Sequence, residues 1–65
     1  MQPHQERVVT EKAELDAKLD KLTEFLKGNV YATLDPGERD RLAKQHTIME
    51  AYSGVLAERI VHFEP

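Results

Sequence analysis

The strongest constraint on this chain is a heptad-like spacing of apolar residues in two segments, which a short joint containing glycine and proline separates. The first stripe consists of Val8, Lys12, Leu15, Leu19, Leu22 and Leu26. The second consists of Leu42, Gln45, Met49, Tyr52, Leu56, Arg59 and Phe63. Alternating steps of three and four residues are typical of an α-helix packed against another helix. We therefore predict an all-α fold, an antiparallel two-helix hairpin.

Residues at the joint predict where each helix ends and begins. Lys27 followed by Gly28 is a typical helix end, because a cation favours the negative end of the helix and glycine readily adopts positive φ. Asp35 and Pro36 predict an N-cap and a first helical residue, with Glu38 reaching back to the cap. We expect a single domain, residues 1–65, with a helix over about 4–27, a loop over 28–35 and a helix over about 36–63.

The small size of the chain predicts self-association. A chain near 65 residues buries only about 60% of its unfolded surface, and disulfides, metals or oligomerisation usually compensate. Disulfides are excluded because there is no cysteine. A lone hairpin also leaves apolar residues on its flanks: Val9, Phe25, Ile48, Val55 and Ile60. Gly54, inside the second helix, suggests that another backbone approaches closely. We therefore expect homo-oligomers with the functional pockets where copies meet.

Composition and charge argue against several kinds of partner. The net charge of −3 is unfavourable for a dedicated DNA- or RNA-binding protein, which needs a concentrated basic face. No segment approaches the roughly 20 apolar residues of a membrane span, and the polar start is unlike a signal peptide. We expect a soluble protein without nucleic-acid polymer or membrane partners.

Catalytic and metal-binding patterns are weak. His46 with Glu50, and Glu58 with His62, are i,i+4 pairs that could each present two metal ligands. A zinc site needs three or four convergent protein ligands, and the hydroxyl residues have no nucleophile motif around them. We therefore expect no catalytic residue, no metal and no cofactor, and the chain is not predicted to be an enzyme.

Basic residues provide the candidate ligand contacts. Arginine binds phosphate oxygens through two parallel hydrogen bonds, so clustered arginines are suited to nucleotide recognition. The alternative interpretations are packed stems with hydrated heads for the cations in the stripes, and surface ion pairs with Glu38 and Asp40 for the others. The candidate ligand-binding residues are Arg7, Lys12, Arg39, Arg41, Lys44 and Gln45.

The chain resembles a known family in two sequence patterns, one in each predicted helix. They are Arg7-Val8, Glu14-Leu15, Lys18-Leu19 and Phe25 in the first helix, then Met49, Tyr52, Leu56 and Arg59-Ile60 in the second. Over nearly its whole length, the chain resembles the helical-hairpin proteins by which bacteriophages counter the CBASS and Thoeris defences. These anti-CBASS and anti-Thoeris sponges sequester cyclic nucleotide immune signals without cleaving them.

The resemblance implies a hexamer of hairpins, with ligand pockets at subunit junctions, in the cytoplasm of the infected bacterial host. Longer sponges carry an N-terminal segment whose aromatic residue caps a cyclic dinucleotide, whereas this chain begins almost directly with its helix. A cyclic trinucleotide at a three-fold junction is therefore favoured over a cyclic dinucleotide. The alternative function is a structural or adaptor hairpin that docks a helix of a partner protein.

Overall fold

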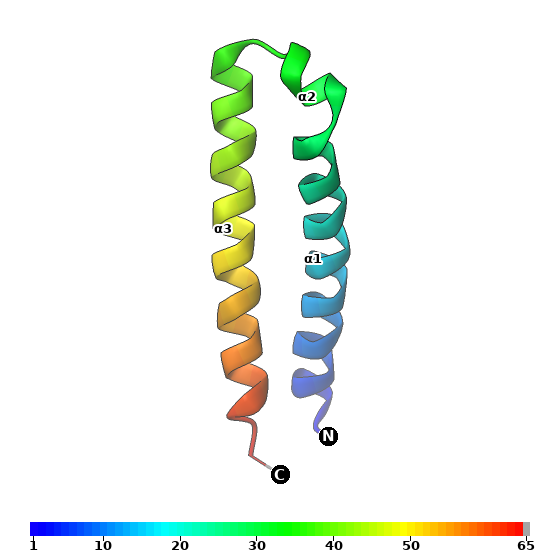
Figure 1. The fold of residues 1–65 in the computed structure, drawn as a ribbon. Helices are drawn as coiled ribbons and strands as arrows, with labels where there is room; N and C mark the ends of the chain where they lie inside the picture. The colour runs from blue at the N-terminus through cyan, green and yellow to red at the C-terminus, as the bar shows by residue number, and fades with distance from the viewer. Residues whose placement is uncertain (65) are drawn as a thin grey trace.

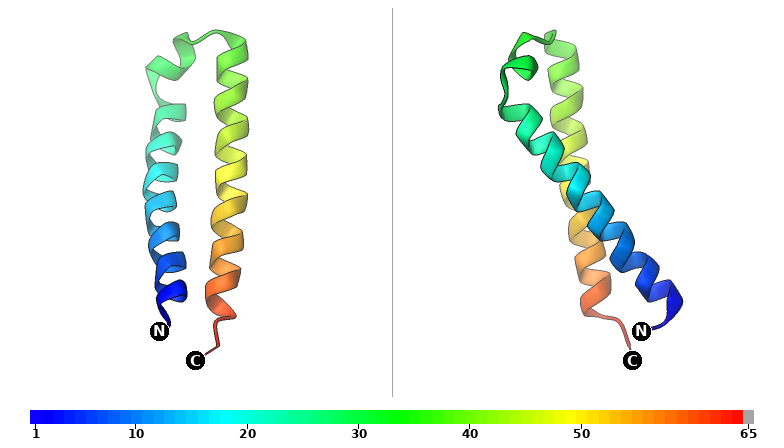
Figure 2. Two further views of the ribbon diagram at one scale, coloured as in Figure 1. Left: turned by 180° about the vertical axis from the view of Figure 1, so that it is seen from behind. Right: turned by 90° about the vertical axis from the view of Figure 1, so that its right-hand side faces the viewer.

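The computed structural model describes residues 1–64 and contains three helices, α1 (Pro3–Lys27), α2 (Asn29–Thr33) and α3 (Pro36–Val61). The long helices α1 and α3 run antiparallel, and both termini lie at the end opposite to α2 (Figure 1). The molecule is a rod of 49 × 15 × 13 Å, in which the two long helices are inclined to each other (Figure 2). The predicted all-helical hairpin is confirmed.

The start of α3 follows the predicted cap, with one difference. The Asp35 carboxylate accepts a hydrogen bond from the Glu38 backbone N–H at 3.1 Å, and Pro36 is the first helical residue. The Glu38 side chain does not reach back to the cap, because it accepts a hydrogen bond from Arg41 Nε at 2.9 Å instead. The boundary between joint and helix is therefore where the sequence predicts it.

The joint differs from the predicted loop because it contains the short helix α2. The chain passes Gly28 in an extended conformation, with φ −90° and ψ 170°, so the predicted positive φ is wrong. Tyr31 of α2 packs edge-on against Phe25, with ring centroids 6.4 Å apart, and its hydroxyl donates to the Arg39 carbonyl at 3.1 Å. These contacts attach α2 to both long helices.

The inner face of α1 is the predicted stripe, whereas the inner face of α3 differs at three positions. Every member of the α1 stripe is buried or half-buried. In α3, three predicted members are exposed, namely Gln45, Tyr52 and Arg59. Their places are taken by half-buried neighbours one residue later, namely His46, Ser53 and Ile60. The prediction failed there because two of these neighbours are polar groups that form hydrogen bonds to α1.

Three hydrogen bonds between the two arms of the hairpin, α1 and the segment from α3 to Glu64, fix the register of one arm against the other. They join Gln5 Nε2 to the Glu64 carbonyl at 2.9 Å, Ser53 Oγ to Asp16 Oδ1 at 2.6 Å, and Thr23 Oγ1 to His46 Nε2 at 2.7 Å. Gln5 and Asp16 are 11 residues apart, and so are their partners Glu64 and Ser53. Asp16 and Thr23 are seven residues apart, and so are their partners Ser53 and His46. Buried polar groups need their partners, so these bonds oppose sliding of one helix along the other.

Candidate functional site

The six predicted ligand-binding residues lie in two groups at opposite ends of the rod. Arg7 and Lys12 are on α1 toward the termini, whereas Arg39, Arg41, Lys44 and Gln45 occupy the first turns of α3 beside α2. The hydrogen-bond register places Arg7 level with His62. At a rise of about 1.5 Å per residue, Arg7 and Arg39 are roughly 35 Å apart along the rod, and Lys12 and Gln45 are roughly 18 Å apart. One hairpin therefore does not bring all six residues together around a small ligand.

At the loop end, two of the cations are paired with carboxylates of their own helix. Arg41 Nε lies 2.9 Å from Glu38 Oε1, and Lys44 Nζ lies 3.1 Å from Asp40 Oδ2. This confirms the alternative of surface ion pairs for both residues. Such exposed pairs contribute only about 0–1 kcal/mol each, so a phosphate could replace the carboxylate at small cost.

Arg39 has a different environment from its basic neighbours. Its side chain is half-buried, its carbonyl accepts the Tyr31 hydroxyl, and its Nε is buried. Within residues 1–64, this Nε has no hydrogen-bond partner. An unpaired buried donor costs about 1–3 kcal/mol. Arg39 is consequently the loop-end cation whose side chain is partly packed into the joint, with one buried donor unpaired.

Lys12 belongs to the packing of the hairpin. Its ammonium lies 2.6 Å from Asp16 Oδ2, and the other carboxylate oxygen accepts the hydrogen bond from Ser53. The hydrogen bond from Lys12, followed by that from Ser53, lowers the pKa of the Asp16 carboxyl below its ordinary value. A ligand phosphate would have to compete with this charged pair between the helices.

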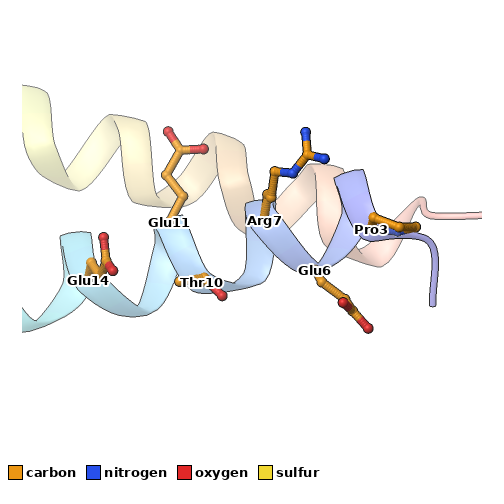
Figure 3. A pocket seen from close by; sticks show the side chains of 6 residues that line it. All are labelled: Pro3, Glu6, Arg7, Thr10, Glu11 and Glu14. Atoms are coloured by element: carbon orange, nitrogen blue, oxygen red, sulfur yellow. The ribbon is translucent and has the colours of Figure 1, made fainter.

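A shallow hollow of about 460 Å³ surrounds Arg7 on the outside of α1. Figure 3 shows Arg7 and Glu11 projecting to one side of the helix and Glu6 to the other. The lining residues are Pro3, Glu6, Arg7, Thr10, Glu11 and Glu14. Three carboxylates against one guanidinium make the potential here unfavourable for an anion. Arg7 alone therefore does not form a phosphate site in one hairpin.

The outer side of α3 carries apolar residues that the hairpin leaves uncovered. We define the outer patch as Ile48, Ala51, Tyr52 and Val55, which are exposed. The exposed fractions of Ile48, Tyr52 and Val55 are 68%, 42% and 52%. Nothing lies within 4 Å of a Cβ built at the nearby Gly54, so the close approach predicted there is not made within one chain.

Two classes of feature are absent from the described part of the chain, residues 1–64. No three side chains of histidine, cysteine, aspartate or glutamate are grouped closely enough to hold a metal ion. No helix in that range is both long and apolar enough to cross a membrane.

Comparison with known proteins gives one family. The sequence model of the Sequestin family matches residues 2–62, which include all three helices. A match of this breadth shows family membership. Searches of curated proteins and of solved structures each found no match.

Proposed function

We propose that this chain, which belongs to the Sequestin family, binds and sequesters a cyclic oligonucleotide immune signal without cleaving it. The single observation that carries the proposal is the family match over residues 2–62, because the family's name denotes sequestration. The resemblance to phage anti-CBASS and anti-Thoeris sponges supplies the ligand class. In this proposal the protein acts in the cytoplasm of the infected bacterial host and needs no cofactor.

The proposal includes assembly of identical hairpins, because one hairpin has little enclosed space of its own. Val8 and Leu56 are the buried hydrophobic residues of the described chain, a small core even for a short protein. The hollow around Arg7 is open to solvent and acidic. A homo-oligomer, for which the resemblance implies a hexamer, would enclose pockets at its junctions and bind a small ligand with little ordering cost.

The loop-end residues are the best-placed phosphate contacts in this proposal. Arg39 forms no ion pair within residues 1–64, and Arg41 and Lys44 can exchange exposed carboxylates for phosphate oxygens. The exposed amide of Gln45 is available to a base edge. A cyclic trinucleotide is favoured over a cyclic dinucleotide, because its three phosphates match three copies of this basic cluster around a three-fold axis.

Isothermal titration calorimetry against a panel of cyclic di- and trinucleotides tests the proposal. We expect binding at micromolar concentration or tighter, with the ligand recovered intact after the protein is denatured. Arg39→Ala should weaken binding about 10- to 100-fold, since a hydrogen bond to a charged group contributes about 1.5–3 kcal/mol. Lys18→Ala, on the exposed side of α1, is the matched control. Absence of heat with every member of the panel, or recovery of a cleaved product, would contradict the proposal.

An adaptor function is the second candidate, and the exposed outer patch of α3 favours it. An amphipathic surface of this kind can dock a helix of another protein. Size-exclusion chromatography with light scattering separates the two candidates. A closed hexamer of the purified chain supports the sponge, whereas a monomer or a simple dimer supports the adaptor.

A further inference from the structure

We infer that two copies of this chain pair through the outer patch of α3, with the two α3 helices antiparallel about a two-fold axis near Ala51. The inference rests on the self-association included in the proposed function and specifies its surface. The four patch residues are spaced i, i+3, i+4 and i+7, so they lie on one side of the helix. All four are exposed in the hairpin formed by residues 1–64.

The outer patch is complementary to itself in the antiparallel orientation. Ile48 and Val55 lie on either side of Ala51, so Ile48 of one copy would contact Val55 of the other. A two-fold interface requires this kind of reciprocal contact. The small side chain of Ala51 and the open space around Gly54 allow the two helices to approach closely.

A second hollow on α3, next to the outer patch, can accommodate a side chain of the second copy. It measures about 330 Å³, is mainly apolar, and is lined by Ala43, Lys44, Thr47 and Ile48. With the axis near Ala51, residues 54–58 of the second copy come level with this hollow. Val55 of that copy would fill it, and the same contact would occur twice because of the two-fold symmetry.

Charge selects the antiparallel orientation over the parallel one. Lys44 and Glu58 are seven residues before and after Ala51, and both are exposed. A parallel pair would place Lys44 beside Lys44 and Glu58 beside Glu58. The antiparallel pair places Lys44 beside Glu58 of the second copy at both ends, which is favourable and specifies orientation.

The antiparallel pair also has a consequence for ligand binding. It brings Arg59 of the second copy level with Ala43, two residues (about 3 Å) from the level of Arg41, at each end of the contact. Arg59 has no ion pair within residues 1–64, and Arg41 is held by one exposed carboxylate. Two arginine side chains from different copies, within about 3 Å of each other in height, form a site for phosphate that a single hairpin lacks.

Cysteine cross-linking tests the pairing directly, because the chain has no native cysteine. Ala51→Cys places one thiol near the two-fold axis, whereas the matched variant Ala13→Cys places it on the exposed side of α1. Under mild oxidation without nucleotide, we expect Ala51→Cys to form a disulfide-linked dimer and Ala13→Cys to stay mostly uncross-linked. Disulfide formation needs Cα atoms about 4.4–6.8 Å apart, so equal cross-linking of the two variants would overturn the inference.

Charge reversal tests the orientation and does not depend on the cysteine variants. Lys44→Glu alone should weaken self-association about five- to thirtyfold, since each dimer loses two attractive pairs and gains two repulsive ones. Combining it with Glu58→Lys should restore association, as measured by sedimentation without nucleotide. A double variant no tighter than the single one would overturn the antiparallel register. A chain that pairs as expected but binds no cyclic nucleotide would contradict the proposed function and leave this inference intact.

Discussion

Replacing Leu56 by alanine should destabilise the hairpin more than any exposed substitution of similar size. Leu56 is the side chain of the described residues that is completely buried, with 0% of its surface exposed. Leu→Ala substitutions in protein cores cost about 2–5 kcal/mol, and the cost rises with the cavity that remains. Only two helices surround this position, so neighbouring side chains and water can enter the space. We therefore expect a loss in the lower half of that range, about 2–3 kcal/mol.

A loss of this size is large for such a small protein. A domain of 65 residues has an unfolding free energy of about 3–10 kcal/mol. For a chain of this length, each kcal/mol shifts the melting temperature by about 4–8 °C. The melting temperature of Leu56→Ala should therefore fall by at least about 8 °C, as measured by circular dichroism at 222 nm.

The matched control for this experiment is Val61→Ala, also in the last turns of α3. Val61 is 79% exposed, so its truncation should change stability by no more than about 0.5 kcal/mol. Both variants are compared with the parent chain at one protein concentration, because the proposed self-association would add stability that depends on concentration. Equal melting temperatures for the two variants would refute the assignment of Leu56 to the centre of the core.

Four further substitutions test the N-cap of α3, the inner face of α3 and the Asp16 carboxylate. Asp35→Ala should destabilise α3 by about 1 kcal/mol in urea denaturation, because the Glu38 N–H loses its acceptor. Ile60→Ala should destabilise the hairpin about as much as other half-buried apolar truncations, about 1–2 kcal/mol, whereas Gln45→Ala should change its unfolding free energy by less than about 0.5 kcal/mol. The pKa of Asp16 is lower in the folded state than its ordinary 3.8, so its contribution to stability is present above that pH and is lost as pH falls through the folded-state pKa. Asp16→Asn should therefore flatten the acid part of the stability profile, and an unchanged profile would contradict the role of the carboxylate.

The ends of the long helices at the joint and the inner face of α1 could be predicted from the sequence, because both depend on local patterns, whereas the short helix α2 was not predicted. The Asp35–Pro36 start needs only neighbouring residues, and the leucines of α1 repeat without interruption. The inner face of α3 could not be predicted fully. His46 and Ser53 look like solvent-facing residues until their partners on α1 are known.

The candidate site was less predictable than the fold. Sequence clustering correctly brings Arg39, Arg41 and Lys44 into the first turns of α3. It does not show that Arg7 lies at the far end of the rod, surrounded by carboxylates. It also cannot separate Lys12, which is tied to Asp16, from cations that remain available to a ligand. These differences depend on the three-dimensional register of the hairpin.

The three hydrogen bonds between the arms of the hairpin affect more than its own stability. Each donor meets its acceptor at one height only, so a shift by one helical turn would break all three together. The spacing of side chains along the outside of the rod is thereby constant from molecule to molecule. In the proposed assembly, each copy would therefore present its side chains at the same spacing, and contacts between copies would need no adjustment of either helix as they form.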